Sequence, residues 1–129
     1  MQYYDIDAGR QDDTEEGTMV NADYIMEHQG AFTLVDVRTP EEFAYGHIPN
    51  AVNIPYAPDF AITDKATSRQ PQAFEKAGIG KDEALVLYCH MGPRAEAAAQ
   101  ALVAAGYANV EVYPGGWADW TSDPSRPAE

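Results

Sequence analysis

The residues best suited to chemistry lie in the run from Cys89 to Arg94, which contains the one cysteine of the chain. An apolar run, 84–88, precedes it and an alanine-rich run, 95–105, follows it, so the cysteine lies at a turn from a strand to a helix. The unpaired amides and the positive dipole end at the start of a helix stabilise an anion. The spacing therefore predicts a nucleophilic thiolate held at the start of this helix.

The turn after the cysteine has the composition of an oxyanion-binding loop. Gly92 can adopt backbone angles closed to other residues, and Pro93 suits the first helical position because its missing N–H needs no partner there. Arg94 adds a permanent cation whose planar fork of donors fits a sulfonate, sulfate or phosphate. Proline supplies no amide, so the residues expected to contact the ligand are His90, Met91, Gly92, Arg94 and Ala95.

Cys89 also has a purely structural interpretation. In most proteins a lone cysteine at the end of a buried strand is a small apolar residue of the core. Glycine, proline and arginine are poor choices for an ordinary buried turn but suit an anion-binding one, so their combination favours chemistry. His90 directly follows the cysteine, and it either donates to the ligand or faces solvent.

Two other polar positions are expected to support the site. Asp36 ends an apolar strand, and a carboxylate there needs partners, of which Arg38 and nearby backbone amides are the nearest in sequence. We expect Asp36 and Arg38 to form a structural clamp. His47 is expected to be a hydrogen-bonded structural residue rather than a catalytic base.

The length and composition indicate a single soluble domain. The chain has 129 residues, 45% of them hydrophobic, and no apolar stretch approaches the roughly 20 residues of a membrane span. The first residues lack the pattern of a secretory signal, which favours the cytoplasm. We expect an acidic flexible N-terminal tail over 1–17, a domain over 18–122 and a C-terminal tail over 123–129.

The strongest compositional signal is a net charge of −13. Residues 1–16 hold six carboxylates and one arginine, so −5 of this charge lies in the tail and −8 in the remainder. Such a chain is a poor partner for nucleic acid and for anionic membranes. One cysteine excludes an internal disulfide, and the three histidines show no ligand spacing, so neither a metal nor another cofactor is expected.

Alternating helix and strand signals predict an α/β fold with three layers, a mostly parallel central sheet and helices on both faces. Asn21 and Thr39 are typical helix caps, and Gly30, Gly46 and Gly106 typical helix ends. The expected helices cover 22–28, 40–45, 71–77 and 95–105, and the expected strands cover 32–37, 51–54, 84–88 and 109–113. In such sheets the functional crevice lies beyond the carboxyl ends of the strands, where Cys89 falls.

Four ordered motifs give the chain a family resemblance: 34–43, 46–55, 89–94 and 115–117. From about Asn21 to Trp120 it resembles the single-domain rhodanese family of sulfurtransferases. Asn50 stands where the family usually has glycine, although asparagine tolerates a left-handed backbone. Pro93 removes one amide of the catalytic loop.

The resemblance implies a ping-pong transfer of sulfane sulfur through a persulfide of Cys89. The donor would be thiosulfate or a related molecule, and the acceptor cyanide or a thiol. With no second cysteine in the chain, the acceptor must be external, and a thioredoxin-like or sulfur-carrier protein is a candidate. Two alternatives remain. One is a phosphatase or arsenate reductase of the same fold, although the loop of those phosphatases is one residue longer than the loop in this chain. The other is a non-catalytic rhodanese-like binding module.

Overall fold

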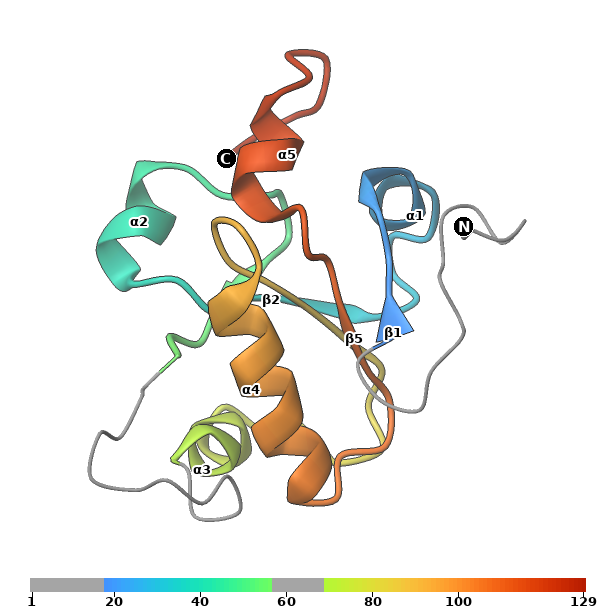
Figure 1. The fold of residues 1–129 in the computed structure, drawn as a ribbon, viewed down its shortest axis with the longest axis vertical. Helices are drawn as coiled ribbons and strands as arrows, with labels where there is room; N and C mark the ends of the chain where they lie inside the picture. Colours follow the sequence, from blue (N-terminus) through green and yellow to red (C-terminus); the bar gives the residue numbers. More distant parts are fainter. Residues whose placement is uncertain (1–17, 57–68) are drawn as a thin grey trace.

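The computed structural model describes residues 18–56 and 69–129, in which strands and helices alternate (Figure 1). Each of the expected elements is present, and two short ones, β1 and α5, were not expected. In chain order the elements are β1 (Thr18–Met19), α1 (Ala22–Glu27), β2 (Thr33–Asp36), α2 (Pro40–Tyr45), β3 (Val52–Asn53), α3 (Gln70–Lys76), β4 (Leu85–Tyr88), α4 (Pro93–Ala104), β5 (Val110–Val112) and α5 (Gly116–Thr121).

The sheet has the strand order β1-β5-β4-β2-β3. Every strand pair in the described part of the chain is parallel, which confirms the predicted sheet type. Asp36 at the end of β2 lies opposite Tyr88 at the end of β4, and Asn53 of β3 lies opposite Asp36. The segments that follow β2, β3 and β4 therefore leave the sheet at the same edge, and Cys89 is the first residue of one of them.

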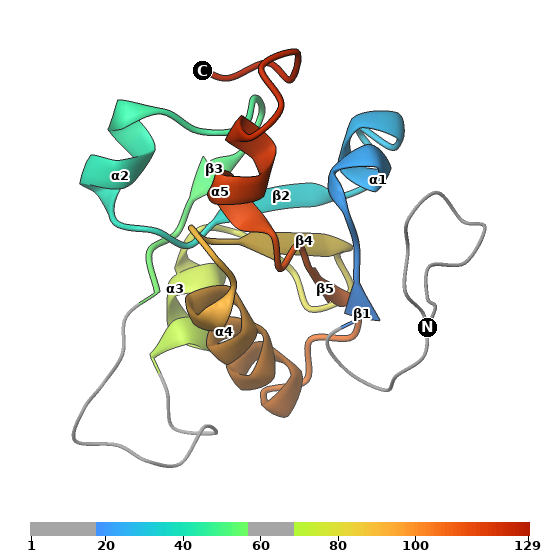
Figure 2. The same cartoon turned by 45° about the horizontal axis from the view of Figure 1, so that its top comes forward.

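Helices cover both faces of the sheet, as Figure 2 shows, with α3 and α4 on one side and α1 and α5 on the other. Leu85 and Leu87 of β4 pack toward the first pair of helices, while Val86 packs toward the second. Large buried side chains fill the two layers: Phe74 and Leu102 on one face, Ile25 and Trp120 on the other. The alternation along β4 is what a strand buried on both faces requires.

Local signals near the site form as predicted. At the start of α2 the Thr39 hydroxyl accepts from the Glu42 amide at 3.1 Å, and the Glu42 carboxylate accepts from the Thr39 amide at 2.9 Å. This reciprocal capping box, with Pro40 in the first turn, begins the helix at its expected residue. Asn50 has a φ of 73°, so it adopts the left-handed conformation that its type tolerates.

The C-terminal residues of the chain are described and pack against the domain. The predicted N-terminal tail, 1–17, lies outside the described residues. At the other end the Trp120 indole donates to the Pro127 carbonyl at 2.7 Å, and the Glu129 amide donates to the His47 carbonyl at 2.8 Å. The last residues thus contact the domain. None of the helices among the described residues has the length and apolar character needed to cross a membrane.

Candidate active site

Cys89 lies in the loop between β4 and α4, and the residue is 1% exposed. The Gly92 amide donates to the Cys89 sulfur at 3.0 Å. Gly92 directly precedes α4 and has a φ of 114°, which an L side chain rarely adopts. The loop therefore turns one amide onto the sulfur at the start of a twelve-residue helix, an arrangement that favours an anion at that position.

The other predicted loop residues lie around this contact. His90 is exposed and Met91 is 67% exposed, so both side chains are on the solvent side of the loop, while Ala95 is fully buried under it. Of the five residues expected to contact a ligand, Gly92 is the one whose amide bonds to sulfur within the described residues. Ligand contact by His90, Met91, Gly92, Arg94 and Ala95 stays a prediction.

The start of α5 holds the loop from outside, a contact that the sequence analysis did not predict. The Trp117 amide donates to the Cys89 carbonyl at 2.8 Å, and the Ala118 amide donates to the His90 carbonyl at 3.1 Å. Gly116 has a φ of 64°, and a side chain there would overlap these two carbonyl oxygens. The glycine pair before Trp117 was the available signal, because it permits such a close approach of two backbones.

The guanidinium group of Arg94 faces a carboxylate of α2. Its two terminal nitrogens donate to the two oxygens of Glu42 at 2.9 and 3.1 Å. The hydrogen bond from Arg94, aided by those from Thr39, lowers the pKa of Glu42 to about 2. The same bond raises the pKa of Arg94 above its ordinary value. This pair joins the first turn of α4 to α2, and Glu42 is a residue of the candidate site that sequence reasoning missed.

Replacing Glu42 with glutamine is expected to make folding less sensitive to acid. The pKa of Glu42 in the folded protein, about 2, lies below its ordinary value of 4.5, so its contribution to stability is present above pH 4.5 and lost as pH falls toward 2. The pair is more than a third exposed, so solvent screening limits this contribution to about 1 kcal/mol or less.

Urea unfolding of the wild type and the Glu42→Gln variant at about pH 6 and about pH 3 measures this difference. The other carboxylates titrate in both proteins, so comparing the two losses isolates Glu42. Equal losses of unfolding free energy in the two proteins would contradict the prediction.

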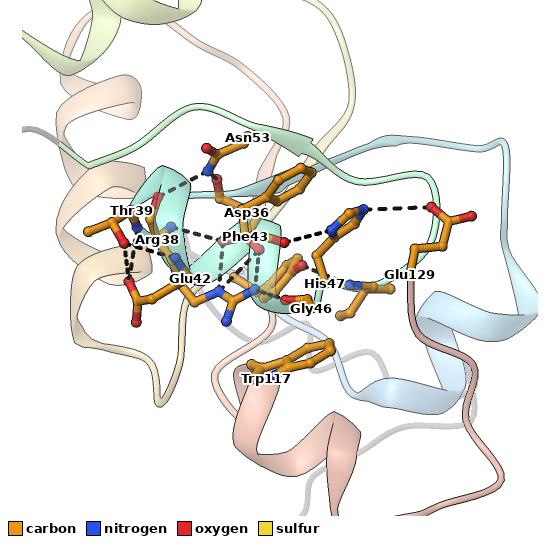
Figure 3. Close-up of polar contacts among 12 residues, drawn as sticks. Asp36, Arg38, Thr39, Glu42, Phe43, Gly46, His47, Asn53, Trp117 and Glu129 are labelled. Carbon is orange, nitrogen blue, oxygen red and sulfur yellow. Dashed lines mark hydrogen bonds and ion pairs between the residues drawn. The ribbon is translucent and has the colours of Figure 1, made fainter.

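The predicted partners Asp36 and Arg38 lie together at the carboxyl edge of the sheet (Figure 3). Arg38 donates to Asp36 through its backbone amide and through two guanidinium nitrogens, the shortest bond being 2.7 Å. It also donates to the Gly46 carbonyl at 2.6 Å, and its guanidinium carbon lies 4.9 Å from the centre of the Trp117 ring. This cluster connects β2, the end of α2 and the start of α5 behind the loop.

His47 is part of the same framework rather than of the sulfur site. Its Nδ1 lies 2.9 Å from the Phe43 carbonyl oxygen, its ring stacks on Phe43 at 3.7 Å, and its Nε2 lies 3.6 Å from a carboxylate oxygen of Glu129 (Figure 3). The structure thus shows the hydrogen-bonded histidine that was predicted. No group of histidine, cysteine and acidic side chains suited to a metal occurs among the described residues.

The described residues combine a parallel sheet, covered by helices on both faces, with a buried cysteine at a strand-to-helix turn. The family model of the rhodanese-like domain matches residues 21–123. The chain belongs to the rhodanese-like family.

Similar proteins agree with this assignment. The chain is 39% identical over 101 residues to the thiosulfate:glutathione sulfurtransferase of Saccharomyces cerevisiae, a match that covers 74% of this chain and 68% of that protein. It is 32% identical to the sulfur carrier protein TtuD of Thermus thermophilus, covering 82% of this chain but 46% of the relative. The human single-domain sulfurtransferase superposes with a TM-score of 0.62 at 26% identity, covering 81% of this chain and 96% of that one. These relatives support a sulfurtransferase role.

Proposed function

We propose that the protein transfers a sulfane sulfur from thiosulfate or a related donor to cyanide or a thiol through a persulfide on Cys89. The observation that carries the proposal is the Gly92 amide bonded to the Cys89 sulfur at the start of α4. A loop amide and a helix start stabilise both a thiolate and a persulfide anion. The yeast relative's name, thiosulfate:glutathione sulfurtransferase, supports the same reaction type.

The reaction has two displacements at sulfur. The Cys89 thiolate attacks the outer sulfur of thiosulfate, the sulfur–sulfur bond of the donor breaks, and sulfite leaves with the electron pair. The acceptor then attacks the terminal sulfur of the persulfide, and the Cys89 thiolate leaves. When the acceptor is cyanide the product is thiocyanate, and when it is a thiolate the product is its persulfide.

The acceptor is external to the chain. Cys89 is the only cysteine of the sequence, so no second thiol of this chain resolves the persulfide. A small thiol or a protein thiol of the thioredoxin-like or sulfur-carrier kind would serve. The name of the Thermus relative, a sulfur carrier protein, supports a role in passing sulfur to another molecule.

Intact mass measurement after incubation with thiosulfate tests the proposal. The protein is expected to gain the mass of one sulfur atom and to lose it when cyanide is added. The Cys89→Ser variant is expected to gain nothing, and because the chain has no other cysteine this control is unambiguous. The proposal fails if no sulfur is gained or if the serine variant gains it. Turnover of an aryl phosphate without sulfur transfer would instead indicate a phosphatase.

A further inference from the structure

The first turns of α2 and α4 carry more negative than positive side chains. The first turn of α2 holds Glu41 and Glu42, and the first turn of α4 holds Glu96 together with Arg94. Three carboxylates thus accompany one guanidinium, in a chain whose net charge is −13. The described first turns of these two helices therefore carry a net charge of −2.

Arg94, the one cation in the first turns of α2 and α4, already holds a carboxylate. Both terminal nitrogens of Arg94 are occupied by Glu42 in the paired geometry with which a guanidinium binds two oxygens of a sulfonate or phosphate. Glu42 is itself fixed, because the Thr39 hydroxyl and amide both donate to its Oε1, at 3.1 and 2.9 Å. An oxyanion donor therefore has to compete with a preorganised internal carboxylate for Arg94.

Arg94 is nevertheless electrostatically connected to the sulfur. Its pKa is raised first by the hydrogen bond to Glu42, and a thiolate at Cys89 contributes to the same rise. Arg94 also stands two residues after Gly92, whose amide donates to the Cys89 sulfur, so the extent to which Glu42 neutralises Arg94 sets the charge next to the reacting atom. The rate of sulfur transfer should therefore depend on the charge that the donor carries next to its transferred sulfur.

We propose that Glu42 is a specificity-determining residue that, by occupying the fork of Arg94, makes Cys89 discriminate against donors with a doubly charged oxyanion. The favoured donors carry their sulfane sulfur on a group with at most one negative charge, such as an organic thiosulfonate or an alkyl persulfide. This proposal rests on the proposed sulfur transfer. Glu42 acts through Arg94 and is a positioning residue.

Two donors that differ by one charge test the proposal. Thiosulfate is a dianion and methanethiosulfonate a monoanion, and both present an outer sulfur whose removal releases sulfite or a sulfinate. The second-order rate of sulfur loading on Cys89 is measured with each donor at low ionic strength, by intact mass. The ratio of the two rates cancels general damage to the site, because a merely structural defect slows both donors alike.

Glu42→Gln is expected to raise the thiosulfate to methanethiosulfonate rate ratio by about three- to tenfold, as removal of one nearby charge in a partly solvated site implies. Glutamine can still complete the capping box, so α2 is expected to remain intact. Glu41→Gln is the matched control, because it removes the same charge from the same helical turn without touching Arg94. It is expected to change the ratio by less than about twofold, and added salt should diminish the effect of Glu42→Gln.

The outcomes separate the two proposals. If the wild type gains sulfur from neither donor, the proposed function fails, and this inference fails with it. If the wild type is loaded but the ratio is unchanged in Glu42→Gln, the specificity role of Glu42 is refuted and sulfur transfer stands. Equal shifts in the Glu41 and Glu42 variants would also refute it, since they would indicate general surface charge rather than the occupied fork of Arg94.

Discussion

Replacing Gly116 with alanine is expected to disrupt the catalytic loop and to reduce sulfur loading of Cys89 more than tenfold. The φ of 64° at Gly116 is unfavourable for an L side chain, at a cost of about 1 kcal/mol. A Cβ at this position would also lie 2.6 Å from the His90 carbonyl oxygen and overlap that of Cys89. Both oxygens belong to the backbone of the loop, so relief of the overlap must displace the loop or the start of α5.

The steric part of this effect has a matched control in Gly78. Its φ is 84°, and among the described residues a Cβ there would have no atom within 4 Å apart from those of its two chain neighbours. Gly78→Ala is therefore expected to cost only the backbone strain, about 1 kcal/mol, while Gly116→Ala costs at least about 2 kcal/mol. Urea unfolding measures the stabilities, and intact mass after thiosulfate treatment measures the loading. Normal loading by a folded Gly116→Ala protein would contradict the assigned role of this contact.

Local sequence signals predicted the parts of this fold that depend on neighbours in the chain. Thr39 and Glu42 form the expected helix start, and Asn21 caps α1 by accepting from the Tyr24 amide at 3.0 Å. Asn50 stands in the left-handed conformation for which its residue type was singled out. Each of these features depends on fewer than five consecutive residues. Over so short a segment, the residue types alone are enough to predict the local conformation.

Features that depend on residues far apart in the sequence could not be predicted from local signals. The pairing of Arg94 with Glu42 joins positions 52 residues apart, and nothing in either local sequence specifies it. β1 has two residues and is defined by its register with β5. α5 begins with Gly116, a weak helix former, so its contact with the Cys89 loop rather than its propensity explains its position.

The position of Cys89, the proposed nucleophile, was therefore predictable, but its surroundings were only partly so. The position of Cys89 at the carboxyl edge of the sheet followed from the order of strand and helix signals. The expectation that Arg94 contacts the ligand did not include its partner Glu42, which changes the charge that the arginine offers to a donor. Tertiary pairing thus decides the electrostatics of a site whose location is set by local signals.

Replacing Arg38 with methionine is expected to destabilise the protein by about 3–5 kcal/mol, because it leaves the carboxylate of Asp36 buried without its charged partner. The Asp36 side chain is 0% exposed and that of Arg38 is 3% exposed, so water cannot take the place of the guanidinium. The change also removes the bond to the Gly46 carbonyl and the contact with the Trp117 ring. The cost should therefore exceed that of losing any exposed ion pair.

The double variant Asp36→Asn, Arg38→Met separates the unpaired charge from the lost packing. Without the orphaned carboxylate, the double variant is expected to be more stable than Arg38→Met alone, although both changes remove the same ion pair. Urea unfolding at neutral pH measures all three proteins, and loading of Cys89 by thiosulfate reports whether Trp117 still holds the loop. If Arg38→Met unfolds within 1 kcal/mol of the wild type, or if the double variant is the least stable, the buried pair is not the clamp of this site.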